Sequence, residues 1–433
     1  MKIRTLLYAT VAILVVSCSE KRIVKSEDIN SFLKNTGITQ TRVSEKSEEI
    51  DFWEKRLSKD TGSTVDKLQL GWLYSELYKS TGNVQYLHRA DSFFTICSKV
   101  NGNFDPDIYF TLSQLAVAKH SFIEAYDYVK TAETKGANKY TAALLGFDAA
   151  MELGKYSDAT QKLELLKDKE AFDYLIRKSK LEDHNGDLES AIEYMENAFE
   201  KVKHLNKPSL YCWALSNLSD MYGHAGKIKQ AYRGYLDVLK KDSSYLYALK
   251  GIAWIAYSHD KNVAEAERII KYILSQTAMP DLYLLLAELE AFKGDKKSGA
   301  FWEKKFLAEI ETNNFGNMYN KYLIQLYADD SAATDRALQL ALSETESRTT
   351  PETFCWLAWV HHKKGNIEKA TALYRNYVLN KTFEPEAMFY GGHIMKAAGQ
   401  KELAKKLFSE CLNSSFELGP LLYQQVRKQL ADL

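Results

Sequence analysis

The stretch LGKYSDA, from Leu153 to Ala159, is written again in the same layout at four later places in the chain. In every copy a glycine lies five residues before an alanine: NGDLESA ends at Ala191, AGKIKQA at Ala231, KGNIEKA at Ala370 and AGQKELA at Ala404. Glycine adopts the left-handed backbone that ends a helix, and alanine lets two helices cross closely. Each copy therefore predicts the turn between two helices and the start of their contact.

The small residue of this phrase recurs at intervals of 32 to 40 residues along most of the chain. Two altered copies, Gly294 to Gly299 and His120 to Ala125, keep the spacing within the phrase. Periods of this size indicate a solenoid of stacked helix pairs. The predicted close-contact positions are Ala125, Ala159, Ala191, Ala231, Ala266, Gly299, Ala337, Ala370 and Ala404.

The prolines give an independent check on this reading. Proline is tolerated in the first turn of a helix, where its missing N–H is not needed. Four prolines lie 14 residues before a turn residue and mark the start of a first helix: Pro106, Pro280, Pro351 and Pro385. Pro208 precedes the first helix of its own repeat. A final amphipathic helix near 420–433, with Leu422, Val426 and Leu430 on one face, is expected to cap the array.

This pattern resembles the tetratricopeptide repeat, a pair of antiparallel helices of about 34 residues. The family's motif has large apolar residues at its fourth, seventh and eleventh positions and small residues near its eighth and twentieth. These match Leu215, Leu218, Tyr222, Ser219 and Ala231 in one copy, and Phe354, Leu357, His361, Ala358 and Ala370 in another. The resemblance implies an all-α, right-handed α-solenoid of about nine to ten repeats over residues 47–433, with altered turns in the copies near Gly82, His259 and Asp329.

The first residues have the layout of an export signal. Lys2 and Arg4 precede an apolar run of 11 residues, which is too short to span a bilayer because a spanning helix takes about 20. The ending LVVSC resembles a bacterial lipoprotein signal, in which a small residue precedes a cysteine that becomes lipid-modified. This resemblance implies a signal peptide over 1–17 and fatty acyl chains such as palmitate on Cys18. The alternative is an ordinary signal that happens to be followed by cysteine.

Residues 18–46 are rich in Ser, Thr, Lys and Glu and are predicted to form a flexible tether between the lipid and the folded body. Ser19 after Cys18, rather than Asp, favours the outer membrane by the common bacterial sorting rule. The expected location is therefore the bacterial cell envelope, with the lipid on Cys18 as the membrane contact.

The charge balance argues against a nucleic-acid partner. The chain has 57 basic and 57 acidic side chains, so no overall field attracts a polyanion, and no basic run replaces one. Besides Cys18, the cysteines lie in segments that the array places far apart. We expect them to be reduced, buried and packed as small apolar residues: Cys97, Cys212, Cys355 and Cys411.

The chain contains none of the motifs that mark common catalytic or metal sites. No GxxxxGK[ST] phosphate loop, GxSxG elbow, HExxH pair or acidic calcium loop occurs. The neighbours His361 and His362 point about 100° apart on a helix and do not suit one metal ion. We therefore expect no enzyme activity, no cofactor and no metal.

A binding surface is expected where the first helices of the repeats line a common groove. In the tetratricopeptide family the second, fifth, ninth, twelfth and thirteenth positions generally point into this groove, and aromatic residues mixed with charge suit recognition. Trp359 is assigned to the groove because Trp356 and Leu357 already fill the packing positions next to it. For Tyr319 and Tyr322, packing in the core is an equal alternative. The resemblance places Asp148, Lys180, Asp220, Glu288, Trp359, His362, Lys363, Phe389, His393 and Lys396 on the concave side, with Tyr319 and Tyr322 between them.

The leading hypothesis is a lipid-anchored scaffold that binds a protein or peptide along its concave face. The alternative is a glycan-binding outer-membrane lipoprotein of the type that combines a lipidated cysteine with tetratricopeptide helices for nutrient capture. Such proteins carry long Gly- and Asn-rich insertions, and this chain has no insertion of comparable length. A hydrolase within the array is a third, weaker possibility.

Overall fold

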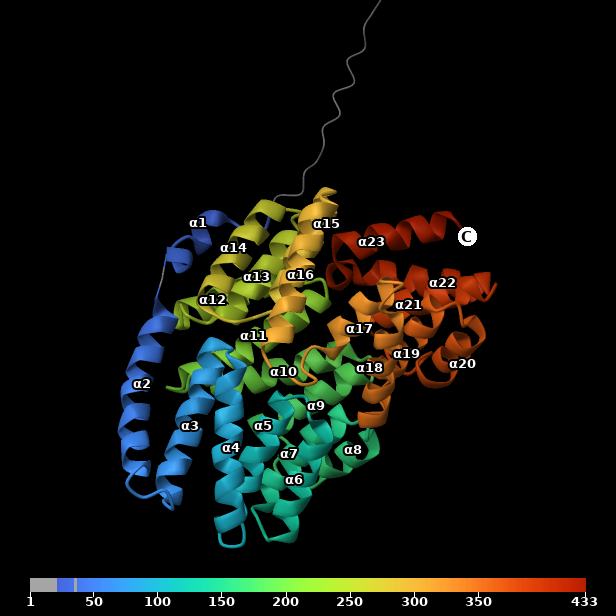
Figure 1. The fold of residues 1–433 in the computed structure, drawn as a ribbon. Coiled ribbons are helices and arrows are strands. Elements are labelled where there is room, and N and C mark those ends of the chain that lie inside the picture. Colours follow the sequence, from blue (N-terminus) through green and yellow to red (C-terminus); the bar gives the residue numbers. More distant parts are fainter. Residues whose placement is uncertain (1–21, 35–36) are drawn as a thin grey trace, which may run out of the picture.

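The computed structural model describes residues 22–34 and 37–433, and the regular elements in this part of the chain are all helices. From α3 to α22 they form ten consecutive pairs, which confirms the prediction of an all-α solenoid of paired helices (Figure 1). The pairs are α3 (Thr64–Thr81) with α4 (Val84–Asn101), α5 (Ile108–Ala118) with α6 (Phe122–Thr134), α7 (Lys139–Glu152) with α8 (Tyr156–Glu164), α9 (Phe172–His184) with α10 (Leu188–Val202), α11 (Pro208–His224) with α12 (Ile228–Lys241), α13 (Leu246–Ser258) with α14 (Val263–Gln276), α15 (Asp281–Lys293) with α16 (Lys296–Thr312), α17 (Asn320–Asp329) with α18 (Thr334–Ser347), α19 (Pro351–Lys363) with α20 (Ile367–Tyr377), and α21 (Pro385–Ala397) with α22 (Lys401–Cys411).

The repeated seven-residue phrase and its two altered copies form the turns inside seven of the ten pairs, as predicted. Gly226 takes a left-handed φ of 70° between α11 and α12, and His120 does the same with a φ of 57° between α5 and α6. Ala231, which follows the first of these turns, is fully buried. Near it, a methyl group added to Gly234 would lie 2.1 Å from Oγ of Ser219 on α11. The two backbones therefore cross at a distance that excludes larger side chains.

Prolines begin first helices where the sequence predicted. Pro208, Pro351 and Pro385 are the first residues of α11, α19 and α21, and Pro280 immediately precedes α15. Since each ring fixes φ near the helical value, proline sets the start of a helix without losing a hydrogen bond.

Later repeats lie directly against earlier ones, so the array closes on itself instead of leaving an open groove. The backbone N–H of Ala278, before α15, donates to the carbonyl of Thr81 at the end of α3 over 2.9 Å. The N–H of Thr349, before α19, donates to Leu153 in the turn after α7 over 3.3 Å. The ring of Phe383, before α21, covers Gly186 in the turn after α9. The first helices therefore enclose an interior.

Residues 22–34 are packed onto the array, where the sequence predicted part of a flexible tether over 18–46. The backbone N–H groups of Ile23 and Val24 donate to the carboxylate of Asp260 over 3.0 and 2.8 Å, and Ile29 in α1 (Ser26–Ile29) is fully buried. The next helix, α2 (Ile38–Leu57), begins inside the predicted tether. A composition rich in polar residues did not reveal this, because the contacts are made by backbone amides and a few apolar side chains, of which Val24 and Ile29 are buried. The predicted signal peptide and Cys18 lie outside the described residues.

The last helix, α23 (Ser415–Ala431), bends at Gly419, whose φ of 72° and ψ of 168° separate a first turn from the helix that Pro420 begins. Val426 is fully buried, with Leu422 and Leu430 packed beside it, as expected of a cap. The cap is only part of its role, because α23 contacts α11, α13, α15 and α21 as well as α22. Figure 1 shows it lying between α15 and the pair α21–α22.

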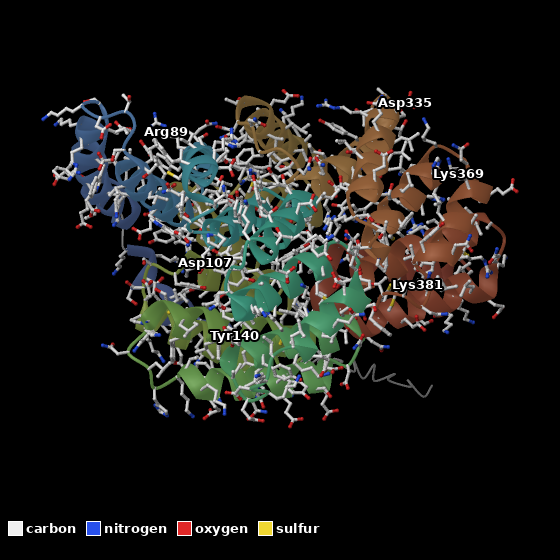
Figure 2. The ribbon with its side chains drawn as sticks, turned by 90° about the horizontal axis from the view of Figure 1, so that it is seen from below. Arg89, Asp107, Tyr140, Asp335, Lys369 and Lys381 are labelled. Carbon is white, nitrogen blue, oxygen red and sulfur yellow. The ribbon has the colours of Figure 1, made fainter. Side chains whose placement is uncertain are left out.

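The outer surface is polar and carries both charges. Figure 2 shows Arg89, Asp335 and Lys369, from the second helices α4, α18 and α20, at the periphery of the molecule. Among the described residues, no helix combines the length and apolar character needed to cross a membrane. The cysteines of the described chain are free and buried, which confirms the prediction for Cys97, Cys212, Cys355 and Cys411.

Candidate functional site

The enclosed interior contains two cavities that share Lys321 and Glu384, and together they form one interior cleft. The α23 chamber, of about 420 Å³, is lined mainly by α11, α13, α21 and the start of α23. The α9 chamber, of about 450 Å³, is lined mainly by α7, α9, α17 and α19. A smaller space of about 50 Å³, also lined by Lys321 and Glu384, lies beside them. Each large chamber accommodates a few side chains but not a folded domain.

The lining of the cleft is acidic. It holds seven carboxylates against four permanently charged cations, an excess of three negative charges when its histidines are neutral. Burial lowers the pKa of His120 and of His184, which keeps both rings uncharged near neutral pH. The charged lining residues are Glu152, Asp183, Asp220, Glu352, Glu384, Glu386 and Glu417, with Lys180, Lys250, Lys321 and Arg348.

Carboxylates crowd one another where the chambers meet. Glu384 is accessible to solvent inside the cleft, but the enclosing protein, together with Glu417 and Glu352, raises its pKa. Burial likewise raises the pKa of Glu417, with His224 opposing the shift and Asp183 adding to it. A cationic ligand placed here would relieve this repulsion.

The three lysines of the cleft are already paired, and Nζ of Lys180 lies 2.8 Å from Glu152. Nζ of Lys321 lies 2.8 Å from Glu386, and Nζ of Lys250 lies 2.6 Å from Asp281. Burial opposes the charge on Lys321 and Lys250, but these carboxylates outweigh it and raise the pKa of each. Because these cations are neutralised in place, the acidic excess remains for a ligand.

Asp220 and Glu288, both predicted groove residues, lie on the wall beside α23. Asp220 accepts hydrogen bonds from the hydroxyls of Tyr235 and Tyr247, the latter over 2.8 Å; burial raises its pKa and the two hydroxyls oppose the shift. Glu288 accepts a hydrogen bond from Tyr257 over 2.9 Å, and burial raises its pKa to about 7. Neither carboxylate has an ion-pair partner among the contacts of the described chain.

The structure buries two predicted groove residues, which corrects their assignment. Trp359 is 9% exposed and stacks on Tyr390 at 4.5 Å, and Phe389 is 4% exposed and meets His393 edge to face at 4.7 Å. The cause is the packing of α19 against the next first helix, α21, where the ring of Trp359 also meets His393 at 5.8 Å. These faces therefore pack against each other rather than line an open groove.

The other predicted groove residues are divided between the cleft, ion pairs and the core. Tyr322 and Lys180 line the α9 chamber, whereas Tyr319 packs between Phe306 and Phe315. Lys363 pairs with Asp329 at 2.9 Å, and Lys396 donates to Gln429 of α23 over 2.8 Å. Asp148 pairs with Arg177 at 2.6 Å, and the ring of His362 stacks on Trp359 at 5.0 Å.

Sequence reasoning missed the acidic residues at the centre of the cleft. A signal for two of them was present, because Glu352 and Glu386 each follow a helix-starting proline, and the two Pro-Glu pairs are separated by 34 residues, one repeat length. Glu384 lies in the segment before α21 and Glu417 in the first turn of α23, both outside the repeat positions, and no periodic signal marks them.

No protein-family model matches the chain, and no curated protein matches it. Solved structures similar to it include a human IFIT1 dimer with PPP-AAAA, at 15% identity and a TM-score of 0.46 over 80% of this chain and 81% of that one. A tetratricopeptide repeat protein from Parabacteroides merdae has 17% identity and a TM-score of 0.35 over 60% of this chain and 97% of its own. PilF of Pseudomonas aeruginosa has 12% identity and a TM-score of 0.36 over 50% of this chain and 96% of its own. At these values the likeness carries no information on what this chain binds.

Proposed function

We propose that this chain is a protein-binding scaffold whose interior cleft receives an extended, basic segment of a partner protein. The observation that carries the proposal is the excess of carboxylates over cations in the cleft. Volumes of about 420 and 450 Å³ suit side chains of an extended segment, and the tyrosines and tryptophans of the walls supply apolar contact area.

The same charge argues against a polyanionic ligand. Like charges held close together across an interface cost several kcal/mol, and the phosphates of a nucleic acid would meet Glu352, Glu384 and Glu386. The lysine that is nearest to these carboxylates, Lys321, is already paired with Glu386. A nucleic-acid partner is therefore disfavoured by the lining itself.

Fluorescence polarisation with short labelled peptides tests the proposal. The peptides contain one Phe among several Lys residues, and matched peptides carry Glu in place of Lys or Ala in place of Phe. We expect the Lys-Phe peptide to bind best. The double variant Glu352→Gln/Glu384→Gln should weaken its binding about tenfold, or about 1.4 kcal/mol.

The matched control is Glu200→Gln/Asp335→Asn, which makes the same charge change at side chains that are 58% and 87% exposed on the outer helices α10 and α18. This control should bind the Lys-Phe peptide as tightly as the wild type. Equal binding of the Glu peptides, or equal affinities in the cleft variant and the control, would refute the proposed partner. A panel of oligosaccharides and RNA in the same assay addresses the rival ligand classes.

The membrane part of the proposal is that lipid on Cys18 holds this scaffold in the bacterial envelope, at the outer membrane. It is supported by the basic start, the apolar run and the Ser17-Cys18 ending of the sequence. Because Ile23 is bound to Asp260, five residue steps remain between Cys18 and the folded body, a reach of at most about 18 Å. The turn before α14 would then lie close to the bilayer.

Labelling with radioactive palmitate in a bacterial host, followed by detergent-phase partitioning, tests this part. We expect the wild type to carry label and enter the detergent phase, and Cys18→Ser to remain unlabelled in the aqueous phase. The control variant Cys97→Ser, at a buried cysteine, should behave as the wild type. Label in the Cys18→Ser protein would refute the anchor.

A further inference from the structure

The first turn of α23 lies on the wall of the α23 chamber, not at the end of the array. The backbone carbonyl of Phe416 accepts hydrogen bonds from Nε1 of Trp254 over 3.0 Å and from Oγ of Ser258 over 2.5 Å, both on α13. Two side-chain donors that converge on one main-chain carbonyl hold a peptide by its backbone. Trp254 and Ser258 could donate the same hydrogen bonds to a carbonyl of any peptide whose backbone passed along this wall.

Glycines on both sides make room for this contact. A methyl group added to Gly223 on α11 would lie 2.6 Å from the ring of Phe416, so the ring packs directly against the helix backbone. A methyl group added to Gly419 would lie 2.9 Å from Trp254 and 3.1 Å from Oε1 of Glu288. The segment is therefore seated in a fitted site formed by α11, α13 and α15.

The seated segment and the wall that holds it both carry acidic side chains. Glu417 lies among Asp183, Glu384 and His224, with a distance of 3.8 Å between its Oε2 and Nδ1 of His224. Glu288, beneath Gly419, is partly buried, and burial raises the pKa of its carboxyl to about 7. An acidic segment thus lies against acidic side chains. A basic segment in its place would be attracted by the same carboxylates.

We propose that residues 415–420 are a ligand that the chain supplies to its own cleft, and that a basic peptide with an aromatic side chain binds the α23 chamber by displacing them. The aromatic side chain takes the place of Phe416 against Gly223. The peptide backbone takes the hydrogen bonds of Trp254 and Ser258. The basic character of the displacing partner rests on the proposed function. The contacts of residues 415–420, called the self-ligand below, do not depend on it.

The test uses the full chain and the variant Phe416→Ala, with Phe301→Ala as the control because Phe301 is 52% exposed on α16. In Phe416→Ala, we expect faster amide hydrogen exchange across residues 415–420 and at least tenfold tighter binding of the Lys-Phe peptide. The synthetic peptide SSFELGPL, which copies Ser414 to Leu421, should bind this variant, and SSAELGPL should bind at least tenfold more weakly. The control should behave as the wild type.

The outcomes separate the inference from the proposed function. Unchanged exchange at 415–420 and equal peptide affinities in wild type and Phe416→Ala would overturn the self-ligand and leave the basic partner standing. Binding of SSFELGPL to Phe416→Ala, without binding of any Lys-Phe peptide, would retain the self-ligand and refute the basic partner. If Phe416→Ala loses helical circular dichroism, Phe416→Leu replaces it, because a smaller apolar side chain weakens the contact with Gly223 and leaves the place of the peptide's ring unchanged.

Discussion

Replacing Glu288 by Gln should stabilise the protein at alkaline pH and leave its stability at acidic pH unchanged. The carboxyl lies between Tyr257 and Gly419, and burial raises its pKa from an ordinary value of 4.5 to about 7. A carboxyl whose pKa is raised by folding holds an extra proton in the folded state, so the free energy of unfolding falls as pH rises through this window. Gln stays neutral and still accepts the hydrogen bond from Tyr257.

The size of the effect follows from the shift. One pKa unit corresponds to 1.36 kcal/mol, so a rise from 4.5 to about 7 amounts to at most about 3 kcal/mol. The wild type loses this stability between about pH 4.5 and pH 7, and Glu288→Gln does not. In a chain of this length, a change of 3 kcal/mol corresponds to a shift in melting temperature of about 3 °C.

Differential scanning fluorimetry of both proteins from pH 5 to pH 8.5 measures this difference. The two melting temperatures should agree at pH 5 and separate by about 3 °C at pH 8, with the variant higher. The control Glu200→Gln, at an exposed side chain on α10, should follow the wild type at every pH. A gap between Glu288→Gln and the wild type that is the same at pH 5 and pH 8 would refute the assignment of a raised pKa to Glu288.

Three further predictions concern the array itself. Ala231→Leu should lower the free energy of unfolding by at least about 2 kcal/mol in urea titrations, because Ala231 is fully buried at a helix crossing. The control Ala300→Leu, at an exposed position, should change this free energy little. Equal effects of the two substitutions would contradict the close-contact assignment. Arg177→Ala should cost about 2–4 kcal/mol in the same titration, since it leaves Asp148 and the carbonyl of Leu144 without their donors, and a loss below about 0.5 kcal/mol would count against this. Burial raises the pKa of the thiols of Cys97, Cys212, Cys355 and Cys411. Alkylation with iodoacetamide at pH 8, followed by mass spectrometry, should therefore be at least a hundredfold slower in the native protein than in guanidinium. Rapid labelling of any of these thiols in the native protein would disprove its burial.

The helix pairs could be predicted from the sequence because their causes are local. A left-handed turn residue such as Gly226 and a close-contact residue such as Ala231 meet steric demands that few other side chains satisfy, so those demands appear directly in the residue types. The prolines that begin α11, α19 and α21 act in the same way. Each feature depends on neighbours within one repeat, and its period survives even where single copies are altered.

The closure of the array could not be predicted, because it accumulates from small rotations between successive repeats. Its contacts join residues nearly two hundred positions apart, such as Thr81 with Ala278 and Leu153 with Thr349, and use backbone groups that every residue possesses. The burial of Trp359 has a more local cause, because its ring stacks on Tyr390 of the next repeat. A groove position in one repeat does not show whether an aromatic side chain of the next first helix will cover it.

The candidate cleft follows from this closure rather than from any motif. Glu352 and Glu386 belong to first helices of neighbouring repeats, Glu384 to the segment before α21 and Glu417 to the first turn of α23. The closed array brings them near Asp183 on α9 and Asp220 on α11. A chain with balanced total charge thus acquires an acidic interior by placing its surplus cations outside. The acidic self-ligand at Phe416 and Glu417 is consistent with this arrangement, because a segment that bound the wall more tightly would not be displaced by a partner.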